Sequence, residues 1–374
     1  MHSRIGKPDG FLLVTVLFLT AFGLVVLYST SAYNGQVRFG DAAYYFKKQF
    51  FAMLLGFVMM YAIASMDYHA LRRFAVPAYL LSLLLSGAVL IFGDAYNGSR
   101  RWLSIGPLSF QPAEYAKPAV ILLLAGTVSS MQNRKNRTMI AAVLLMVLPI
   151  VGLVGTNNLS TAVIILGIAV SMIFISNPRY LPFLWMILAG GGFLGIFLSL
   201  ESYRLERLEI WRHPEQFEKG YQTMQGLYAI GSGGIFGRGL GKSMQKLGFV
   251  PEAQNDMIFS VICEELGLFG ALLLMLLFLL LLWRFMVIAT HAPDLFGSLI
   301  ASGIMGHIAI QVILNIAVVT NTIPNTGITL PFISYGGTSM MFLLSEMGLA
   351  LSVSRWCVYP GKRFSKGREK KSGR

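Results

Sequence analysis

The chain has 374 residues, of which 55% are hydrophobic and only 13% are charged, and its mean hydropathy is +0.64. A soluble domain of this size needs more polar surface, so the composition excludes that class and predicts an integral membrane protein. The net charge of +13 does not indicate nucleic-acid binding, because the basic residues flank apolar segments; we expect no nucleic-acid partner.

Apolar stretches of about 20 residues recur along the whole chain, and each could cross a hydrocarbon core ~30 Å thick as a helix. We therefore expect an all-α, polytopic integral membrane protein in which residues 1–354 form a single domain of ten transmembrane helices. The first stretch lacks the small-residue cleavage site of a secretory signal. The predicted spans are 10–30, 47–66, 74–93, 113–130, 139–156, 159–176, 181–200, 257–284, 296–320 and 336–354.

Lys and Arg are concentrated in short segments on one side of these spans, such as "MHSRIGK" and "MQNRKNR". Because short cytoplasmic loops are enriched in basic residues, both termini are predicted to be cytoplasmic. The basic tail, 355–374, is then a topology signal and an anchor to anionic lipid, with docking of a partner as the alternative. The one long loop, 201–256 between the seventh and eighth spans, is predicted to be extracytoplasmic.

The first group of polar residues near the membrane lies in "NGSRRWLSIGPLSFQPAEYAKPA" (97–119), on the outer side. Polar residues at membrane depth must be hydrated, paired or used, so they indicate function by default. Glu114 and Lys117 are three residues apart and can pair on one helical face, either in a site or as a purely structural ion pair. The other candidates in this group are Arg100, Arg101 and Gln111.

The long loop is basic although it is predicted to lie outside, and long loops tolerate such charge. Its glycine-rich part carries Arg238, Lys242 and Lys246, which favour an anionic partner; lipid head groups are the alternative. Clustered glycines allow backbone amides to cradle a phosphate, although simple flexibility would also explain them. The stretch "GRGLGKS" does not have the spacing of a nucleotide-binding P-loop.

Acids recur where the eighth span begins, in "NDMIFSVICEELG" (255–267). Asn255 or Asp256 could cap this helix, or Asp256 could belong to a site at the mouth of the span. Glu264 lies two turns deeper and is rotated by only ~80° from Asp256, so we expect the two to share a cavity. Glu265 falls on the opposite face and is expected to pair elsewhere in the bundle.

The third group is "NTIPNTGITLPFISYGGTS" (321–339), in which two prolines and several glycines disfavour a regular helix. Irregular backbone near the membrane is tolerated only where it lines protein or water. Ser334 and Thr338 add hydroxyl groups. All three groups map to the outer side, which predicts a cavity that is open to the outside.

In these three groups the sequence resembles the SEDS family of cell-wall polymerases, the relatives of RodA, FtsW and SpoVE. The ten spans, the cytoplasmic ends and the long loop after the seventh span are also that family's arrangement. Two stretches, "NGSRRWLSIG" and "LPFISYGGTS", are nearer the FtsW and SpoVE branch than RodA. The resemblance is carried, in order, by "NGSRRW", "QPAEYAK", "GRGLGKSMQKLGFVPEAQNDMIFSVICEELGLFG" and "QVILNIAVVTNTIPNTGITLPFISYGGTS".

The resemblance implies a peptidoglycan glycosyltransferase of the bacterial cytoplasmic membrane that acts in cell division or cell shape. Its substrates would be lipid II, an undecaprenyl-pyrophosphate-linked disaccharide peptide, and the growing glycan strand. The implied partners are a class B penicillin-binding transpeptidase and other membrane proteins of the division or elongation machinery. A lipid II flippase and a non-catalytic scaffold remain alternatives, although we find no internal repeat of the kind that transporters often carry.

The resemblance also implies roles for particular residues. Asp256 falls on the family's catalytic acid and would accept the proton of an attacking hydroxyl in an inverting transfer. We expect it to be ionised at neutral pH, helped by the helix N-terminus and nearby basic residues. A divalent cation, Mg²⁺ or Mn²⁺, is a candidate cofactor. The leaving pyrophosphate would be met by Arg100, Arg101, Lys117, Arg238, Lys242 and Lys246, and the cavity would be supported by Gln111, Glu114, Asn158, Glu264, Ser334 and Thr338.

One stretch departs from the family's pattern. Between the fifth and sixth spans the family usually reads "QPDLGTA" or "EPDFGTA", whereas this chain reads "TNNLSTA" (156–162). Asn158 stands in place of the acid, and Ser160 in place of the glycine. A charge is therefore missing from the expected wall of the cavity, which points to altered activity, to shifted metal or substrate contacts, or to a specialised paralogue.

Overall fold

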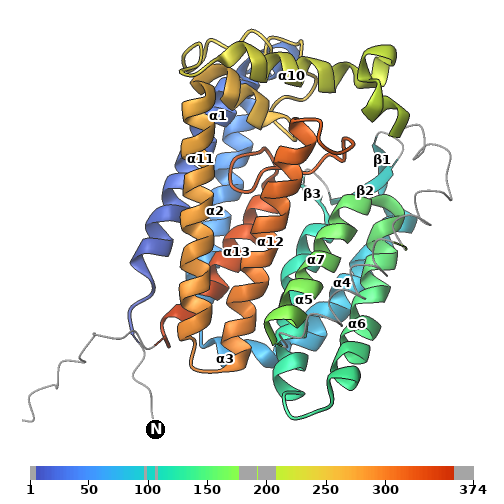
Figure 1. The fold of residues 1–374 in the computed structure, drawn as a ribbon, viewed down its shortest axis with the longest axis vertical. Helices are drawn as coiled ribbons and strands as arrows, with labels where there is room; N and C mark the ends of the chain where they lie inside the picture. The colour runs from blue at the N-terminus through green and yellow to red at the C-terminus, as the bar shows by residue number, and fades with distance from the viewer. Residues whose placement is uncertain (1–5, 97–98, 106–107, 177–191, 193–207, 358–374) are drawn as a thin grey trace, which may run out of the picture.

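The computed structural model describes residues 6–96, 99–105, 108–176, 192 and 208–357. Its helices run side by side along the long axis of the molecule (Figure 1). One end of the bundle carries the short helix α3 (Tyr68–Leu71), and the other carries α10 (Tyr221–Gly233) and three short strands. We refer to these as the α3 end and the α10 end.

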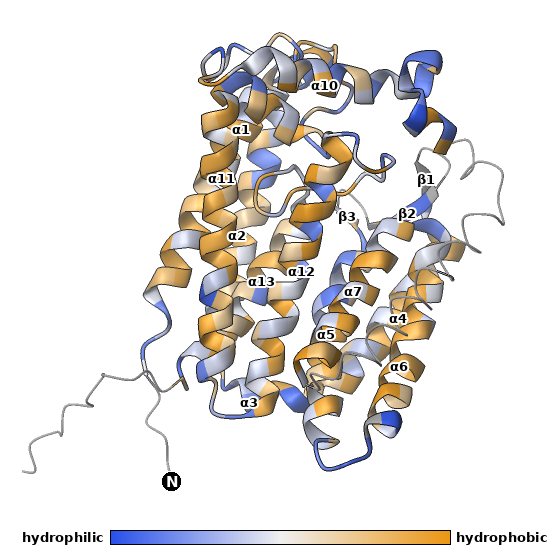
Figure 2. Ribbon diagram, viewed as in Figure 1, coloured by the Kyte–Doolittle hydropathy of each residue, from blue (hydrophilic) through white to orange (hydrophobic). Residues whose placement is uncertain are grey.

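Seven helical segments in the described residues are long and apolar enough to cross a membrane, which confirms a multi-pass membrane protein. Figure 2 shows hydrophobic residues along the length of these helices. Each segment coincides with one of the predicted spans. They are α1 (Gly10–Phe39), α2 (Tyr44–Ser65), α3 with the 3₁₀ turn η1 (Arg72–Phe74) and α4 (Ala75–Phe92), α6 (Asn136–Asn157), α7 (Leu159–Ser176), α11 (Ile258–His291) and α12 (Leu295–Val319).

Two further helices, α5 (Pro112–Ser130) and α13 (Gly337–Ser354), coincide with the predicted spans 113–130 and 336–354. They have spanning length but contain charged residues, and most of their side chains are buried within the bundle. α13 packs along α2, and α5 packs against α4, α7 and α12. These two helices therefore bring charge into the interior. The predicted span 181–200 lies outside the described residues.

Helix ends follow local rules of capping. Asp9 accepts a hydrogen bond from the backbone N–H of Leu12 at the start of α1, and Asp294 accepts one from Gly297 at the start of α12. Such caps satisfy amides that have no partner within the helix. Pro112 opens α5, where its missing N–H is harmless.

A small antiparallel sheet follows α4 at the α10 end, with strands β1 (Asp94–Tyr96), β2 (Ser99–Ile105) and β3 (Leu108–Phe110) in the order β1-β2-β3. The register places Ala95 opposite Arg100, and Ser104 opposite Ser109. The all-α prediction missed this sheet, because strands of three to seven residues are too short for an alternating pattern of apolar and polar residues to be recognised. The sheet sets Arg100 and Arg101 on its opposite faces.

The region 201–256 is not simply a loop, because α10 forms within it and packs across the beginning of α11 (Figure 1). Its buried side includes Thr223, Gly226 and Ala229, whereas Tyr221 and Tyr228 are exposed. This alternation of buried and exposed positions is that of a surface helix. It closes the α10 end of the bundle above α11.

The helix α11 is broken at Gly267, whose φ of 66° and ψ of −167° are not helical. The segment 234–239 crosses this break and supplies the missing hydrogen bonds. The N–H groups of Arg238 and Gly239 donate to the carbonyls of Glu264 and Glu265, each at 2.9 Å. On the other side of the break, the N–H groups of residues 268 and 269 donate to the carbonyls of residues 234 and 235. The backbone groups on both sides of the break thus find partners within the protein, as a span requires.

Candidate functional site

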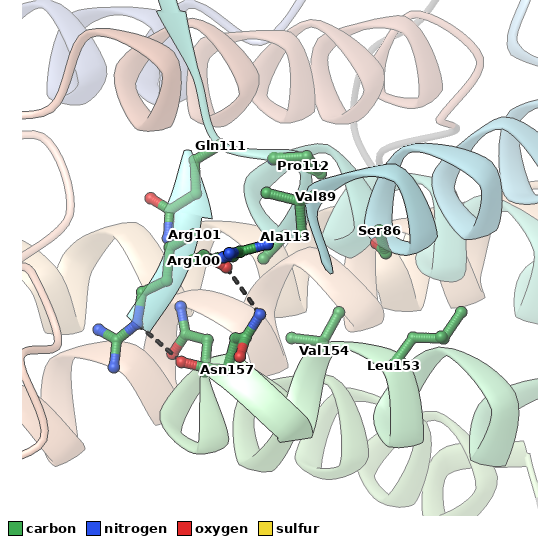
Figure 3. A pocket seen from close by; sticks show the side chains of 11 residues that line it. Ser86, Val89, Arg100, Arg101, Gln111, Pro112, Ala113, Leu153, Val154 and Asn157 are labelled. Atoms are coloured by element: carbon green, nitrogen blue, oxygen red, sulfur yellow. Dashed lines mark hydrogen bonds between the residues drawn. The ribbon is translucent and has the colours of Figure 1, made fainter. Parts of the chain in front are cut away.

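A small cavity lies where the sheet meets the ends of α4, α5 and α6 (Figure 3). It brings together four of the residues proposed from the sequence. It also includes Ser86 and Asn157, which sequence reasoning missed. The lining residues are Ser86, Val89, Arg100, Arg101, Gln111, Pro112, Ala113, Leu153, Val154, Asn157 and Asn158.

Strand β2 and the end of α6 are joined by two reciprocal hydrogen bonds at this cavity. Arg101 Nε donates to the carbonyl of Asn157 at 2.7 Å, and Asn157 Nδ2 donates to the carbonyl of Arg100 at 2.8 Å (Figure 3). Arg100 itself donates to the carbonyl of Ile91 at 3.1 Å, beside the end of α4. Backbone carbonyls therefore fix both arginines at the cavity.

Asn158, at the position where the family carries an acid, is buried between α6 and α7. Its Oδ1 accepts a hydrogen bond from the N–H of Thr161 at 3.2 Å. The side chain thus supports the start of α7 while it lines the cavity. Ser86 is also buried there, and its Oγ has no hydrogen-bond partner among the described residues.

Asp256 lies just before α11, and the structure excludes the capping role. The helix begins at Ile258 after Met257, and no side chain caps it. Asp256 is 9% exposed, and its Oδ1 accepts a hydrogen bond from Gln222 of α10 at 3.2 Å. Its backbone carbonyl accepts one from Asn315 of α12 at 2.9 Å. Hydrogen bonds from two helices therefore hold the residue in place.

Burial, together with the negative charge of Glu252, raises the pKa of Asp256 to about 6, against hydrogen bonds from the local backbone and from Gln222. The carboxyl is still mainly ionised at neutral pH, as predicted. Backbone amides at the start of α11 favour the charged form, as expected, but burial outweighs them and leaves the pKa above its usual value. A carboxyl with this pKa is suited to accept a proton.

The segment 325–329 forms the wall beside this carboxyl. A Cβ at Gly327, whose φ is 70°, would lie 4.0 Å from Asp256 Oδ2. Ser160 Oγ donates to the carbonyl of Thr326 at 2.9 Å, and Asn315 donates to that of Ile328 at 2.7 Å. The hydroxyl that departs from the family's pattern therefore anchors the wall next to Asp256.

Glu114 and Lys117 form the predicted ion pair, with 3.0 Å between Lys117 Nζ and Glu114 Oε2. Both side chains are buried. Lys117 Nζ also donates to Oε1 of Gln311 at 3.1 Å, and Gln311 Nε2 donates to the carbonyl of Thr329 at 3.0 Å. Gln311 thereby connects the ion pair of α5 to the wall beside Asp256.

The expectation that Glu264 shares a cavity with Asp256 was wrong. Glu264 is fully buried, and it accepts hydrogen bonds from the Ser243 hydroxyl and from the N–H of Met244 at 3.0 Å. Arg238 also lies 3.4 Å from Glu264. Glu264 thus fastens the basic loop to the first half of α11.

Glu265 pairs elsewhere, as predicted, and its partner is Lys246 at 2.7 Å. Lys246 is only 6% exposed, and its Nζ also donates to Ser29 Oγ. This placement corrects its assignment as a pyrophosphate ligand, since Glu265 of α11 and Ser29 of α1 hold its ammonium group. Arg238 and Lys242 remain exposed.

Two of the proposed hydroxyl groups differ in their surroundings. Ser334 is buried, and its Oγ accepts a hydrogen bond from the N–H of Leu330 at 2.8 Å, so it stabilises the local turn. Thr338 Oγ1 is buried and has no hydrogen-bond partner among the described residues. Nowhere in the described residues do three His, Cys, Asp or Glu side chains converge to hold a metal ion.

Comparison with known proteins gives a consistent result. The family model FtsW/RodA/SpoVE, described as a cell cycle protein, matches residues 10–357. The chain is 39% identical over 367 residues to stage V sporulation protein E of Bacillus subtilis, covering 96% of this chain and 100% of that protein. It is 36% identical over 359 residues to the probable peptidoglycan glycosyltransferase FtsW of Trichlorobacter lovleyi, with 94% of each chain covered.

A solved structure gives the same picture in three dimensions. It is a chain of a peptidoglycan synthase complex, studied for the structural coordination of polymerization and crosslinking. The two folds agree with a TM-score of 0.79 and 31% sequence identity, over 93% of this chain and 98% of that one.

Proposed function

This chain belongs to the family of cell cycle proteins that includes FtsW, RodA and SpoVE, and on that premise we propose that it is a peptidoglycan glycosyltransferase that polymerises lipid II in division or cell shape. The observation that supports this most is Asp256. It is a buried carboxyl beside an irregular wall, its pKa is about 6, and hydrogen bonds from α10 and α12 hold it.

In the proposed reaction, the 4-hydroxyl of a GlcNAc attacks the anomeric carbon of a lipid-linked MurNAc with inversion. The new C–O bond forms as the bond from the anomeric carbon to the pyrophosphate oxygen breaks, and the electron pair leaves on undecaprenyl pyrophosphate. Asp256 accepts the proton of the attacking hydroxyl. A base whose pKa lies slightly below the working pH is mostly free to do so and still binds the proton well.

The departing pyrophosphate requires positive charge. We assign this role to Arg100 and Arg101 on β2, to Lys117 on α5, and to the exposed Arg238 and Lys242 of the loop. Lys246 is left out, because Glu265 and Ser29 hold its ammonium group, whereas Lys117 is linked through Gln311 to the wall beside Asp256. A Mg²⁺ or Mn²⁺ ion would be held mainly by pyrophosphate oxygens, since such ions commonly use few protein carboxylates.

We propose that the α10 end faces outward from the bacterial cytoplasmic membrane and that both termini are cytoplasmic, as the basic short loops at the α3 end favour. The proposed partner is a class B penicillin-binding transpeptidase, together with other division or elongation proteins. The similar chain from a peptidoglycan synthase complex supports this partnership.

The decisive experiment incubates the purified protein, alone and with a transpeptidase, with labelled lipid II and measures glycan polymer. We expect Asp256→Asn to lower the initial rate by roughly 10²-fold or more, as the loss of a general base does. Asp41→Asn removes a solvent-exposed carboxylate that pairs with Lys47 and serves as the matched control. Near-normal polymer from Asp256→Asn would sink the assignment, and lipid II translocation into vesicles without polymer would favour a flippase.

A further inference from the structure

A chain of buried polar side chains runs from α5 through α12 to α13. Beyond the contact between Lys117 and Gln311, His307 Nε2 lies 2.8 Å from Gln311 Oε1. His307 Nδ1 lies 2.7 Å from Glu346 Oε2. His307 and Glu346, which were not among the residues predicted from the sequence, lie midway along α12 and α13. The chain therefore reaches from the proposed site into the middle of the spans.

The hydrogen-bond partners determine which atoms carry protons. Gln311 Nε2 donates to the carbonyl of Thr329, so Oε1 is the atom that faces both Lys117 and His307. An amide oxygen only accepts, so His307 Nε2 must carry a hydrogen. One further proton lies between His307 Nδ1 and Glu346, and the pair is neutral overall whichever of the two holds it. Glu114 and Lys117 are likewise neutral as a pair.

Stability alone does not explain such a series of buried polar side chains. His307 is 2% exposed and Glu346 is fully buried, and Glu346 Oε1 has no hydrogen-bond partner among the described residues. Buried ion pairs commonly add little stability compared with apolar residues of similar volume, and ionisable groups within spans commonly serve function.

The polar face of α12 shows which groups these hydrogen-bonded side chains can hold in place. His307, Gln311 and Asn315 are spaced at four-residue intervals, which sets them on one face of the helix. Gln311 holds both Lys117 and the carbonyl of Thr329. Asn315, one turn further on, holds the carbonyls of Ile328 and Asp256. One helix face thus positions the proposed pyrophosphate-binding lysine and the backbone of the proposed base.

We propose that His307 and Glu346 are positioning residues for the transferase, which act through the Gln311 amide to hold Lys117 and the segment 325–329 in register with Asp256. This inference rests on the proposed function, since it concerns the geometry of that same site. It assigns a role to a histidine and a glutamate that touch no substrate. The physical basis is that small displacements of a catalytic or binding group strongly reduce turnover.

The test compares polymerisation of lipid II by four variants in the purified, full-length protein. His307→Leu removes the donor to Gln311, and we expect kcat to fall roughly 10-fold while KM changes little. Glu346→Gln should keep most of the activity, because its amide can donate to His307 Nδ1 and preserve the same tautomer. Glu346→Leu should resemble His307→Leu. Ser345→Ala, which removes a hydroxyl bonded to its own helix at Met341, is the matched control.

A double variant separates positioning from general damage. If His307 acts through Gln311, His307→Leu combined with Gln311→Leu should be no worse than Gln311→Leu alone. If the reductions in kcat of the two single variants multiplied in the double variant, the proposal would be overturned, as it would by a normal kcat in His307→Leu. His307→Leu with Glu346→Leu removes both partners and keeps the interior neutral, so a low rate with an unchanged Tm in this variant supports positioning over misfolding. A wild-type protein that makes no polymer would instead refute the proposed function itself.

Discussion

The side-chain amide of Asn315 donates to the backbone carbonyl of Asp256 at 2.9 Å, and the same nitrogen donates to Ile328 at 2.7 Å. Asn315 is fully buried in α12. One amide therefore joins the backbone of Asp256 to the segment 325–329, the wall beside its carboxyl group. The proposed base is oriented through its main chain, and its side chain remains available for a proton.

Replacement of Asn315 by Ala should therefore damage both fold and rate. Two buried carbonyls lose their donor, which should cost about 1–3 kcal/mol of unfolding free energy, and the base should shift relative to its wall. We expect polymerisation to fall roughly 10-fold. Thermal unfolding and initial rates measure the two effects, with Thr320→Ala on the exposed end of the same helix as the control. A normal rate in Asn315→Ala would show that this tie does not orient the base.

The rate should depend on the ionisation of Asp256. Since burial raises its pKa to about 6, kcat/KM for lipid II should rise through pH 6 and level off above it. Glu252→Gln removes a charge that raises this pKa, so the inflection should move to lower pH. A rate that is constant across this range, or an upward shift in Glu252→Gln, would exclude Asp256 as the titrating base.

The same burial should make Asp256 unfavourable for stability. Its pKa is raised on folding from 3.8 to about 6, so the folded state binds the proton more tightly. The stabilisation is complete below the unfolded pKa and is lost as pH rises through the folded pKa. We expect Asp256→Asn to have a higher Tm than the wild type at neutral pH, with the difference shrinking towards about pH 4. A lower Tm for Asp256→Asn than for the wild type at neutral pH would contradict the inference that the buried Asp256 carboxylate is destabilising.

The ion pair of Lys246 and Glu265 should be structural. Glu265→Gln leaves a buried ammonium without a counter-charge and should cost about 3–5 kcal/mol of unfolding free energy. Adding Lys246→Met should restore most of it, because the interior is then neutral and the introduced amide oxygen can still accept from Ser29. Thermal unfolding measures both. If Lys246→Met alone lowered the rate with an unchanged Tm, Lys246 would instead belong with the substrate.

The break in α11 should not tolerate a side chain. A Cβ at Gly237 would lie 2.2 Å from the carbonyl of Glu265, and its φ is 76°. We expect Gly237→Ala to lower the unfolding free energy by more than about 2 kcal/mol. Gly231→Ala is the control, because this residue lies in α10 with open space around it, and alanine should be neutral or slightly stabilising there. Equal Tm values for the two variants would refute the close crossing.

Local patterns accounted for much of this structure. Runs of apolar residues predicted the long helices that form the bundle, since length and hydropathy are local properties. The pair of Glu114 and Lys117 was predicted from a three-residue spacing and is confirmed at 3.0 Å. Arg100, Arg101 and Gln111, which line the cavity in Figure 3, came from a stretch already singled out.

The rest depends on contacts between distant parts of the chain. The partners of Glu264 and Glu265 are set by a loop that precedes them in the chain, and helical geometry alone placed Glu264 on the wrong neighbour. His307 and Glu346 meet across 39 residues, and nothing in either helix indicates the other. The short strands formed only because each pairs with the next.

The crossing at Gly267 has a consequence for how the protein is made. Until the segment 234–239 lies across α11, the N–H groups of Leu268 and Phe269 and the carbonyls of Glu264 and Glu265 can pair only with each other, in the i to i−4 pattern of an unbroken helix. The glycine-rich segment leaves the ribosome before α11, so its hydrogen-bonding groups are already present when the helix enters the bilayer. We therefore expect α11 to bend at Gly267 only when the preceding loop closes over it, so that loop closure and bending form one folding step. We expect an epitope tag inserted between residues 234 and 239 to prevent both the closure and the bend.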